Sequence, residues 1–226
     1  MLNITFSKKS VLIAGILLSI LLPLLVICTS LALKQFNLNF ASQFLISRFS
    51  QWIAFVLLFL FAIKIEKRPF LLWKEKEYSV LDTLKAIGKT MLLLVIGMLV
   101  IGIVIKFLNA NVKSTLLDKT IHVLQDNFVF LLFTCITAGI VEEFIFRGYM
   151  FPRLEIILKS NRLAILISSF IFGIMHYSYG TLTQTLGPMV FGVILALQYQ
   201  KYKSIKIVII SHFLWDLVVL LTKSLN

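Results

Sequence analysis

Six ionisable side chains lie within apolar stretches in the second half of the chain. A charged group in the core of a bilayer costs several kcal/mol, so by default it marks a functional site. A carboxylate within hydrogen-bond reach of a water can act as a general base, and a histidine N–H can stabilise an oxyanion. Together these residue types predict a functional site within the membrane. The six residues are Glu142, Glu143, Arg147, His176, His212 and Asp216.

The two adjacent glutamates are predicted to have different roles. On a helix, Glu143 and Arg147 share a face and can form an ion pair, because they are spaced i, i+4. Glu142 is rotated by about 100° from Glu143 and points elsewhere. We therefore interpret Glu143 and Arg147 as a structural pair that fixes a helix end, whereas Glu142 is free to face a site between helices.

The same i, i+4 spacing relates Phe172 to His176 and His212 to Asp216. Either histidine alone could simply hydrogen-bond a neighbouring helix. Their occurrence together with Glu142 favours one shared site between helices. Phe172 is expected to pack against that site.

Composition places these residues in a membrane protein. The 226 residues are 59% hydrophobic and only 14% charged, against about 45–50% and about 25% in a soluble domain. The net charge of +12 is gathered in short segments between apolar runs, which is typical of topology signals and of contacts with anionic headgroups. The sequence shows no basic face with interleaved aromatic residues, so nucleic-acid binding is not expected.

The apolar runs predict an all-α fold, a polytopic transmembrane helix bundle with about seven membrane spans. We expect a single integral membrane domain over residues 1–226. Residues 1–90 form N-terminal helices and a basic connector, and residues 91–226 contain the motif-bearing core at 128–221. The predicted spans are Val11–Leu33, Phe44–Ile63, Met91–Leu108, Phe128–Met150, Leu163–Tyr177, Leu186–Gln200 and Ile205–Leu221.

Loop charges predict the orientation, because basic residues favour the cytoplasmic side. The segments before the first span, between the second and third, after the fourth and before the last are rich in Lys and Arg, whereas residues 178–184 carry no charge. The N-terminus is therefore expected in the cytoplasm. The connector over residues 64–90 is interpreted as cytoplasmic, with an amphipathic interfacial helix and with Trp73 and Tyr78 at headgroup level.

Helix geometry then predicts the depth of the site. A helix rises about 1.5 Å per residue, so Glu142 is expected about 12 Å and His176 about 20 Å from the cytoplasmic end of its predicted span. One site in the cytoplasmic half of the membrane, or near its middle, is compatible with these depths. The residues Lys119, His122 and Asp126 are interpreted as loop residues flanking the fourth span. Cys28 and Cys135 lie in apolar runs and are not expected to form a disulfide.

Three motifs follow one another on successive predicted segments. Residues 142–147 read Glu-Glu-Phe-Ile-Phe-Arg, residues 172–176 read Phe-Gly-Ile-Met-His, and residues 212–216 read His-Phe-Leu-Trp-Asp. In this order the motifs EExxxR, FxxxH and HxxxD resemble the CAAX-protease and bacteriocin-processing family of intramembrane proteases, also called CPBP or Abi. The resemblance covers a little under half the chain, from about Phe128 to Leu221.

The resemblance implies an intramembrane glutamic-type endopeptidase that cleaves peptides or proteins, membrane-associated ones included. Glu142 and His176 would activate a water, and His212 and Asp216 would contact the developing oxyanion. An ionised Asp216 would repel an oxyanion, so it is either protonated or orients His212 by accepting its N–H, and we favour the second. A bacterial cell membrane is the expected location, and bacteriocin immunity is among the roles that the family implies.

Three other functions are compatible with these residues. Glu142, His176, His212 and Asp216 have donor chemistry suited to zinc, although the chain lacks H-E-x-x-H and we expect no cofactor. A non-catalytic immunity, regulatory or scaffold protein could keep the charges as structure. Intramembrane Glu and His also mark transporters and proton relays, but the chain shows no repeated halves.

Cysteine labelling from either side of the membrane tests the orientation. Residues 64–90 and 152–162 should react from the cytoplasm and residues 178–184 from outside, because basic loops stay on the cytoplasmic side. Labelling of residues 152–162 from the outside alone would reverse the orientation.

Overall fold

A computed structural model describes residues 6–110, 112–125 and 127–224, and within these ranges the regular elements are all helical. The prediction of an all-α bundle is confirmed. Six helical stretches in the described part of the chain are long and apolar enough to cross a membrane. They are Lys9–Thr29, Phe40–Glu66, Val80–Phe107, Phe128–Leu158, Asn161–Tyr179 and Ile205–Thr222.

The α-helices are joined by short 3₁₀ and π segments. The α-helices are α1 (Phe6–Ala32), α2 (Phe40–Leu60), α3 (Val80–Phe107), α4 (Thr115–Gln125), α5 (Phe128–Thr137), α6 (Phe151–Leu158), α7 (Asn161–Met175), α8 (Thr183–Tyr202) and α9 (Ile205–Ser224). The 3₁₀ segments are Leu33–Phe36 and Tyr177–Tyr179, and the π segments are Phe61–Glu66, Ala138–Glu142 and Phe144–Met150.

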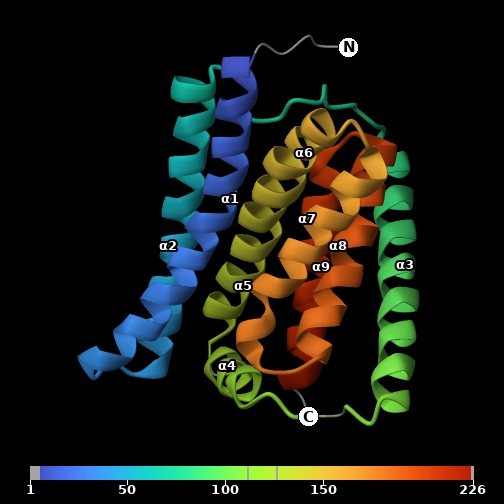
Figure 1. The fold of residues 1–226 in the computed structure, drawn as a ribbon. Helices are drawn as coiled ribbons and strands as arrows, with labels where there is room; N and C mark the ends of the chain where they lie inside the picture. The colour runs from blue at the N-terminus through green and yellow to red at the C-terminus, as the bar shows by residue number, and fades with distance from the viewer. Residues whose placement is uncertain (1–5, 111, 126, 225–226) are drawn as a thin grey trace.

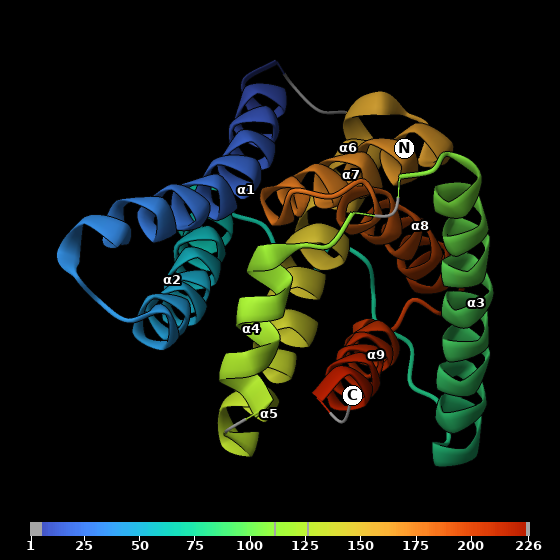
Figure 2. The same ribbon diagram turned by 90° about the horizontal axis from the view of Figure 1, so that it is seen from below.

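Figure 1 shows the long helices running roughly side by side, with α1 and α2 as a hairpin on one flank and α3 on the other. Between them lie α7, α8, α9 and the continuous helix made of α5, the π segments and α6. The short helix α4 crosses one end of the bundle. The loop end of the α1–α2 hairpin leans away from the other helices in both views (Figures 1 and 2).

The predicted span Leu186–Gln200 corresponds to α8, which is not among the six apolar stretches. Its 20 residues are long enough to cross a bilayer, and α8 packs between α3 and α7. Its contact with α7 is close, since a Cβ on Gly173 would lie 2.7 Å from the carbonyl oxygen of Thr185. Because α8 faces other helices more than lipid, its sequence tolerates more polar residues than the other spans.

Large apolar side chains remain exposed along the outer faces of the bundle. Leu25, Ile53, Leu99 and Ile103 are each more than half exposed. A soluble domain rarely exposes apolar surface on this scale. The exposed faces fit a surrounding of lipid, and the chain is an integral membrane protein.

The connector between the second and third spans differs from the prediction. No amphipathic helix forms there: residues 67–79 are non-helical, and α3 begins at Val80, earlier than the predicted Met91. Ser79 caps α3, since its hydroxyl accepts a hydrogen bond from the Asp82 amide at 3.1 Å. The connector is fixed by hydrogen bonds to residues of α6, α8 and α9.

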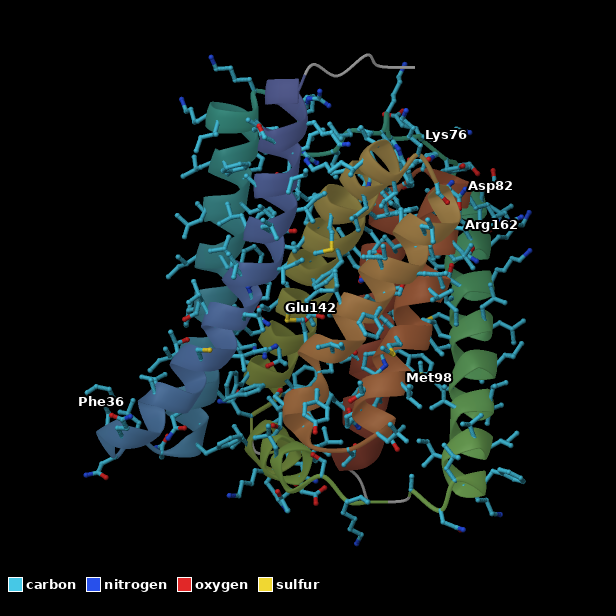
Figure 3. All side chains as sticks on the ribbon, viewed as in Figure 1. Phe36, Lys76, Asp82, Met98, Glu142 and Arg162 are labelled. Atoms are coloured by element: carbon cyan, nitrogen blue, oxygen red, sulfur yellow. The ribbon has the colours of Figure 1, made fainter. Side chains whose placement is uncertain are left out.

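Glu75 is one of these attachments. Its carboxylate accepts hydrogen bonds from the Ile205 amide at 2.5 Å and from the Tyr199 hydroxyl at 3.1 Å. Ile205 is the first residue of α9, so the carboxylate also lies at the positive end of a helix dipole. The connector therefore ties α8 and α9 together at this end of the bundle. Lys76, Asp82 and Arg162 mark the same end in Figure 3.

Arg153 on α6 provides the other attachment and is completely buried. Its Nε donates to both carboxylate oxygens of Glu66 at 3.0 and 2.9 Å, and its Nη atoms donate to the carbonyls of Phe70 and Pro69. The Tyr149 hydroxyl adds a third hydrogen bond to Glu66 at 3.0 Å. One guanidinium thus joins the end of the second span, the connector and α6.

The segment before the fourth span is also more regular than predicted. Lys119 and His122 were expected in a loop but lie in α4, whose first turn contains Asp118. Negative charge near a helix N-terminus stabilises the helix through its dipole. Asp126 lies outside the described residues.

The Glu66–Arg153 pair yields a stability prediction. Glu66→Gln should lower the free energy of unfolding by about 3–5 kcal/mol, because it leaves a buried guanidinium without its counter-charge. Glu77→Gln, in the exposed part of the connector, is the matched control and should have little effect. Thermal unfolding in detergent measures both, and equal midpoints for the two variants would contradict a stabilising role for this pair.

Candidate active site

The two motif glutamates lie where the fourth span departs from α-helical geometry. Glu142 ends the π segment Ala138–Glu142, and Glu143 precedes the π segment Phe144–Met150. π segments are rare and frequently occur at functional sites. A Cβ on Gly139 would lie 3.1 Å from the carbonyl oxygen of Ile209, so its absence lets α9 approach this helix closely.

Glu143 is the buried centre of a charged cluster. Its Oε1 accepts hydrogen bonds from Arg147 Nη1 at 2.6 Å and from His212 Nδ1 at 2.7 Å. The three residues are 0%, 2% and 4% exposed. The predicted pairing of Glu143 with Arg147 is therefore present, and His212 is an additional partner from α9.

The contact with Glu143 defines the proton on His212. A carboxylate oxygen only accepts, so Nδ1 of His212 is the donor. The other ring nitrogen, Nε2, lies 3.5 Å from Asp216 Oδ2, which is long for a hydrogen bond. Glu143 therefore orients His212, a role that we had expected of Asp216. Asp216 itself is partly exposed.

His176 has a similar arrangement on α7. Its Nδ1 lies 2.8 Å from the backbone carbonyl of Phe172, which accepts a hydrogen, so Nδ1 carries the proton. The neutral ring then has its lone pair on Nε2, which can accept a hydrogen bond from water. Phe172 packs beneath the site: the Arg147 guanidinium lies 4.5 Å from its ring centroid and the His176 ring 4.8 Å.

Two chambers meet at Glu142 and His176. The first, of about 250 Å³, lies between the α1–α2 hairpin, α7 and the continuous helix of α5, the π segments and α6, which carries Glu142 and Glu143 and is called the motif helix below. The second, of about 400 Å³, is bordered by α2, α3, α4, α8 and α9. The residues that line both include Arg48, Gln51, Glu142, His176 and Tyr179.

The structure brings the four predicted site residues to one cavity, since Glu142, His176, His212 and Asp216 all line the second chamber. Glu143 and Arg147 are buried behind it. In Figure 3 the label Glu142 lies on the motif helix near the middle of the bundle, and Met98 on α3 marks the far side of the second chamber.

Glu142 lies farther from the end of its helix than predicted. The fourth span continues through α6 to Leu158 instead of ending near Met150, so Glu142 lies about 24 Å along the helix from this end, not about 12 Å. Thr120 of α4 lines both chambers. The chambers thus extend from the middle of the bundle towards the α4 end, opposite the basic connector.

The potential zinc donors do not form a recognisable metal cluster. Within the described ranges, no group of three or more His, Cys, Asp and Glu side chains is arranged to hold a metal ion. Of the four donors, His212 is engaged by Glu143 and His176 by the Phe172 carbonyl.

Two features of this site escaped the sequence prediction. The Glu143–His212 bond joins residues on separate helices, and no local spacing indicates it. Arg48 lies outside the three motifs, but an arginine within the predicted span Phe44–Ile63 is itself a signal of a functional site.

Residues 124–218 match the model of the Rce1-like family, described as type II CAAX prenyl endopeptidase Rce1-like. Comparisons with curated proteins and with solved structures give no match. The matched residues contain all three motifs, and the match agrees with the family resemblance predicted from them. It also supports the predicted activity, that of a membrane-embedded peptide-bond hydrolase.

Replacing the central carboxylate should destabilise the fold. Glu143→Gln leaves the buried Arg147 without a counter-charge, which should cost about 3–5 kcal/mol. Adding Arg147→Gln should restore part of this loss, because removing both charges is less costly than removing one. Thermal unfolding in detergent measures the variants, and an unchanged midpoint for Glu143→Gln would show that the pair does not stabilise the bundle.

Proposed function

We propose that this member of the Rce1-like CAAX endopeptidase family cleaves a peptide bond inside the membrane by a glutamic-type mechanism, with Glu142 and His176 activating the water. The observation that carries the proposal is the position of these two side chains, on the wall that both chambers share. A peptide lying from one chamber into the other would place one of its bonds beside them.

In the proposed reaction, a water donates hydrogen bonds to the Glu142 carboxylate and to Nε2 of His176. As the water oxygen attacks the scissile carbonyl carbon, Glu142 accepts the proton, and the carbonyl π electrons move onto the oxygen. Glu142 then returns the proton to the departing amide nitrogen as the C–N bond breaks. A neutral amine and a carboxylic acid result, so atoms and charge balance.

His212 is proposed to stabilise the oxyanion from Nε2. Because Nδ1 already donates to Glu143, this role requires a proton on both ring nitrogens. Glu143 and Asp216 are the two carboxylates that face the ring. Asp216 would balance the ring's charge in the resting enzyme, and the substrate would displace its long contact with Nε2.

The substrate is proposed to be a peptide or protein segment that reaches the chambers from the lipid or from the α4 end. Basic loops at the connector end favour a cytoplasmic N-terminus in a bacterial cell membrane. In that orientation, cleavage is proposed to occur near the middle of the membrane, within the range of depths that the sequence predicts. No metal is required by this mechanism.

Glu142→Gln should reduce cleavage by about 10²–10⁴-fold, because glutamine keeps the volume but cannot accept a proton from water. Its unfolding midpoint should stay near that of the wild type, since Glu142 forms no ion pair among the described residues. Comparing the membrane peptidomes of cells with wild-type protein and with this variant measures cleavage.

Three outcomes would contradict the mechanism. Unchanged peptidomes would favour an immunity or scaffold role. Loss of activity on chelation, with stoichiometric metal in the purified protein, would favour a metalloprotease. An active Glu142→Gln beside a well-folded but inactive Glu143→Gln would reverse the two glutamates' roles.

A further inference from the structure

Arg48 is a charged residue of α2 on the wall of both chambers. It lies outside the residues 124–218 that match the family. Its Nε is buried and has no hydrogen-bond partner among the described residues. Within that part of the chain, no carboxylate lies within the 4.0 Å ion-pair limit of its guanidinium.

The nearby acidic residues do not supply this missing charge. Glu143 is bound by Arg147 and His212, and Asp216 faces His212. Glu142 lines the same chambers but does not form an ion pair with Arg48. Arg48 is half-buried, and its Nε is fully buried. An arginine stays charged in a protein, and withdrawing part of that charge from water without a counter-ion carries a desolvation cost. A counter-anion that arrives with the substrate would offset this cost.

The guanidinium is held in a way that leaves its donors available. It lies over the Phe44 ring, with Cζ 4.8 Å from the centroid. Stacking uses the face of the planar group, whereas its N–H edge matches the two oxygens of a carboxylate. Gln51, one turn along the same helix face, has a buried Oε1 that also has no partner and can accept an N–H of a bound peptide.

We propose that Arg48 binds a carboxylate of the peptide substrate and makes the site selective for peptides that present one close to the cleaved bond. The inference rests on the proposed function, since it concerns the same cavity. The carboxylate belongs either to the C-terminus of the substrate or to an Asp or Glu side chain, because both present the same pair of oxygens.

Matched peptides test the proposal. One apolar, fluorescent Leu- and Ala-rich peptide is made with a free C-terminal carboxylate, with a C-terminal carboxamide, and as the carboxamide with one internal Glu. Binding is measured by fluorescence anisotropy to the Glu142→Gln protein in vesicles of phosphatidylethanolamine and phosphatidylglycerol, which separates binding from cleavage. Protein-free vesicles supply the background.

A carboxylate peptide should bind about tenfold to a hundredfold more tightly than the plain carboxamide, as expected for a charge-assisted hydrogen bond. Arg48→Gln should abolish this preference, and Arg48→Lys should weaken it, because lysine keeps the charge but lacks the planar fork. Lys106→Gln, which removes a charge from an exposed position on α3, should leave the preference intact. Binding restored by the internal Glu assigns the carboxylate to a side chain; otherwise it belongs to the C-terminus.

Equal binding of all three peptides, or a preference that survives Arg48→Gln, would overturn the proposal. A second result would also overturn it. If Arg48→Gln, in a protein that keeps Glu142, shifts the pH dependence of carboxamide cleavage, then Arg48 acts on Glu142 instead of on the substrate. Cleavage by the wild type without any preference sinks only the Arg48 assignment. If the carboxylate peptides bind preferentially but the wild type cleaves none of them, the role of Arg48 is supported and the proposed hydrolysis is contradicted.

Discussion

The site depends on the two hydrogen bonds that the Glu143 carboxylate accepts. The carboxylate accepts them from Arg147 on its own helix and from His212 on α9, and all three side chains are buried. A lone charge at this depth would be prohibitive, but a carboxylate shared by two donors is tolerated and directional. One side chain therefore fixes the motif helix against α9 and sets the proton position on the histidine. The neighbouring Glu142 lies on the cavity wall and has no ion-pair partner in the part of the chain that the structure describes.

A second buried carboxylate, that of Glu66, also joins separate helices, at the connector end of the bundle. With Arg153 it joins the second span to α6, while Glu75 joins the connector to α8 and α9. The hairpin of α1 and α2 is thus anchored by polar contacts at this end, and its other end leans away from the bundle (Figure 2). Polar interactions define both the rigid end of the protein and its chemistry, whereas apolar packing fills the space between them.

The helical fold and the membrane setting could be predicted from apolar runs, because lipid imposes a period and a length that are visible in the sequence. The connector could not, since its extended path depends on Arg153, which is distant in the chain. For the site, i, i+4 spacing found the Glu143–Arg147 pair, but nothing local links Glu143 to His212. The predicted distance of Glu142 from the end of its helix was too short because the fourth span continues beyond Arg147 into α6, and the apolar pattern does not indicate where the helix ends.

The wall between the chambers has a consequence for turnover. If a bound peptide spans both chambers, hydrolysis at Glu142 leaves one fragment in the space beside the α1–α2 hairpin and the other beside α3 and α9. The fragments then depart by separate routes and do not compete for one exit. Product release often limits the rate of enzymes, and here each route would have its own barrier, set by different helices. Of the two helices of the hairpin, α2 lines both chambers but α1 lines only the first, so a displacement of α1 would affect the escape of one fragment alone.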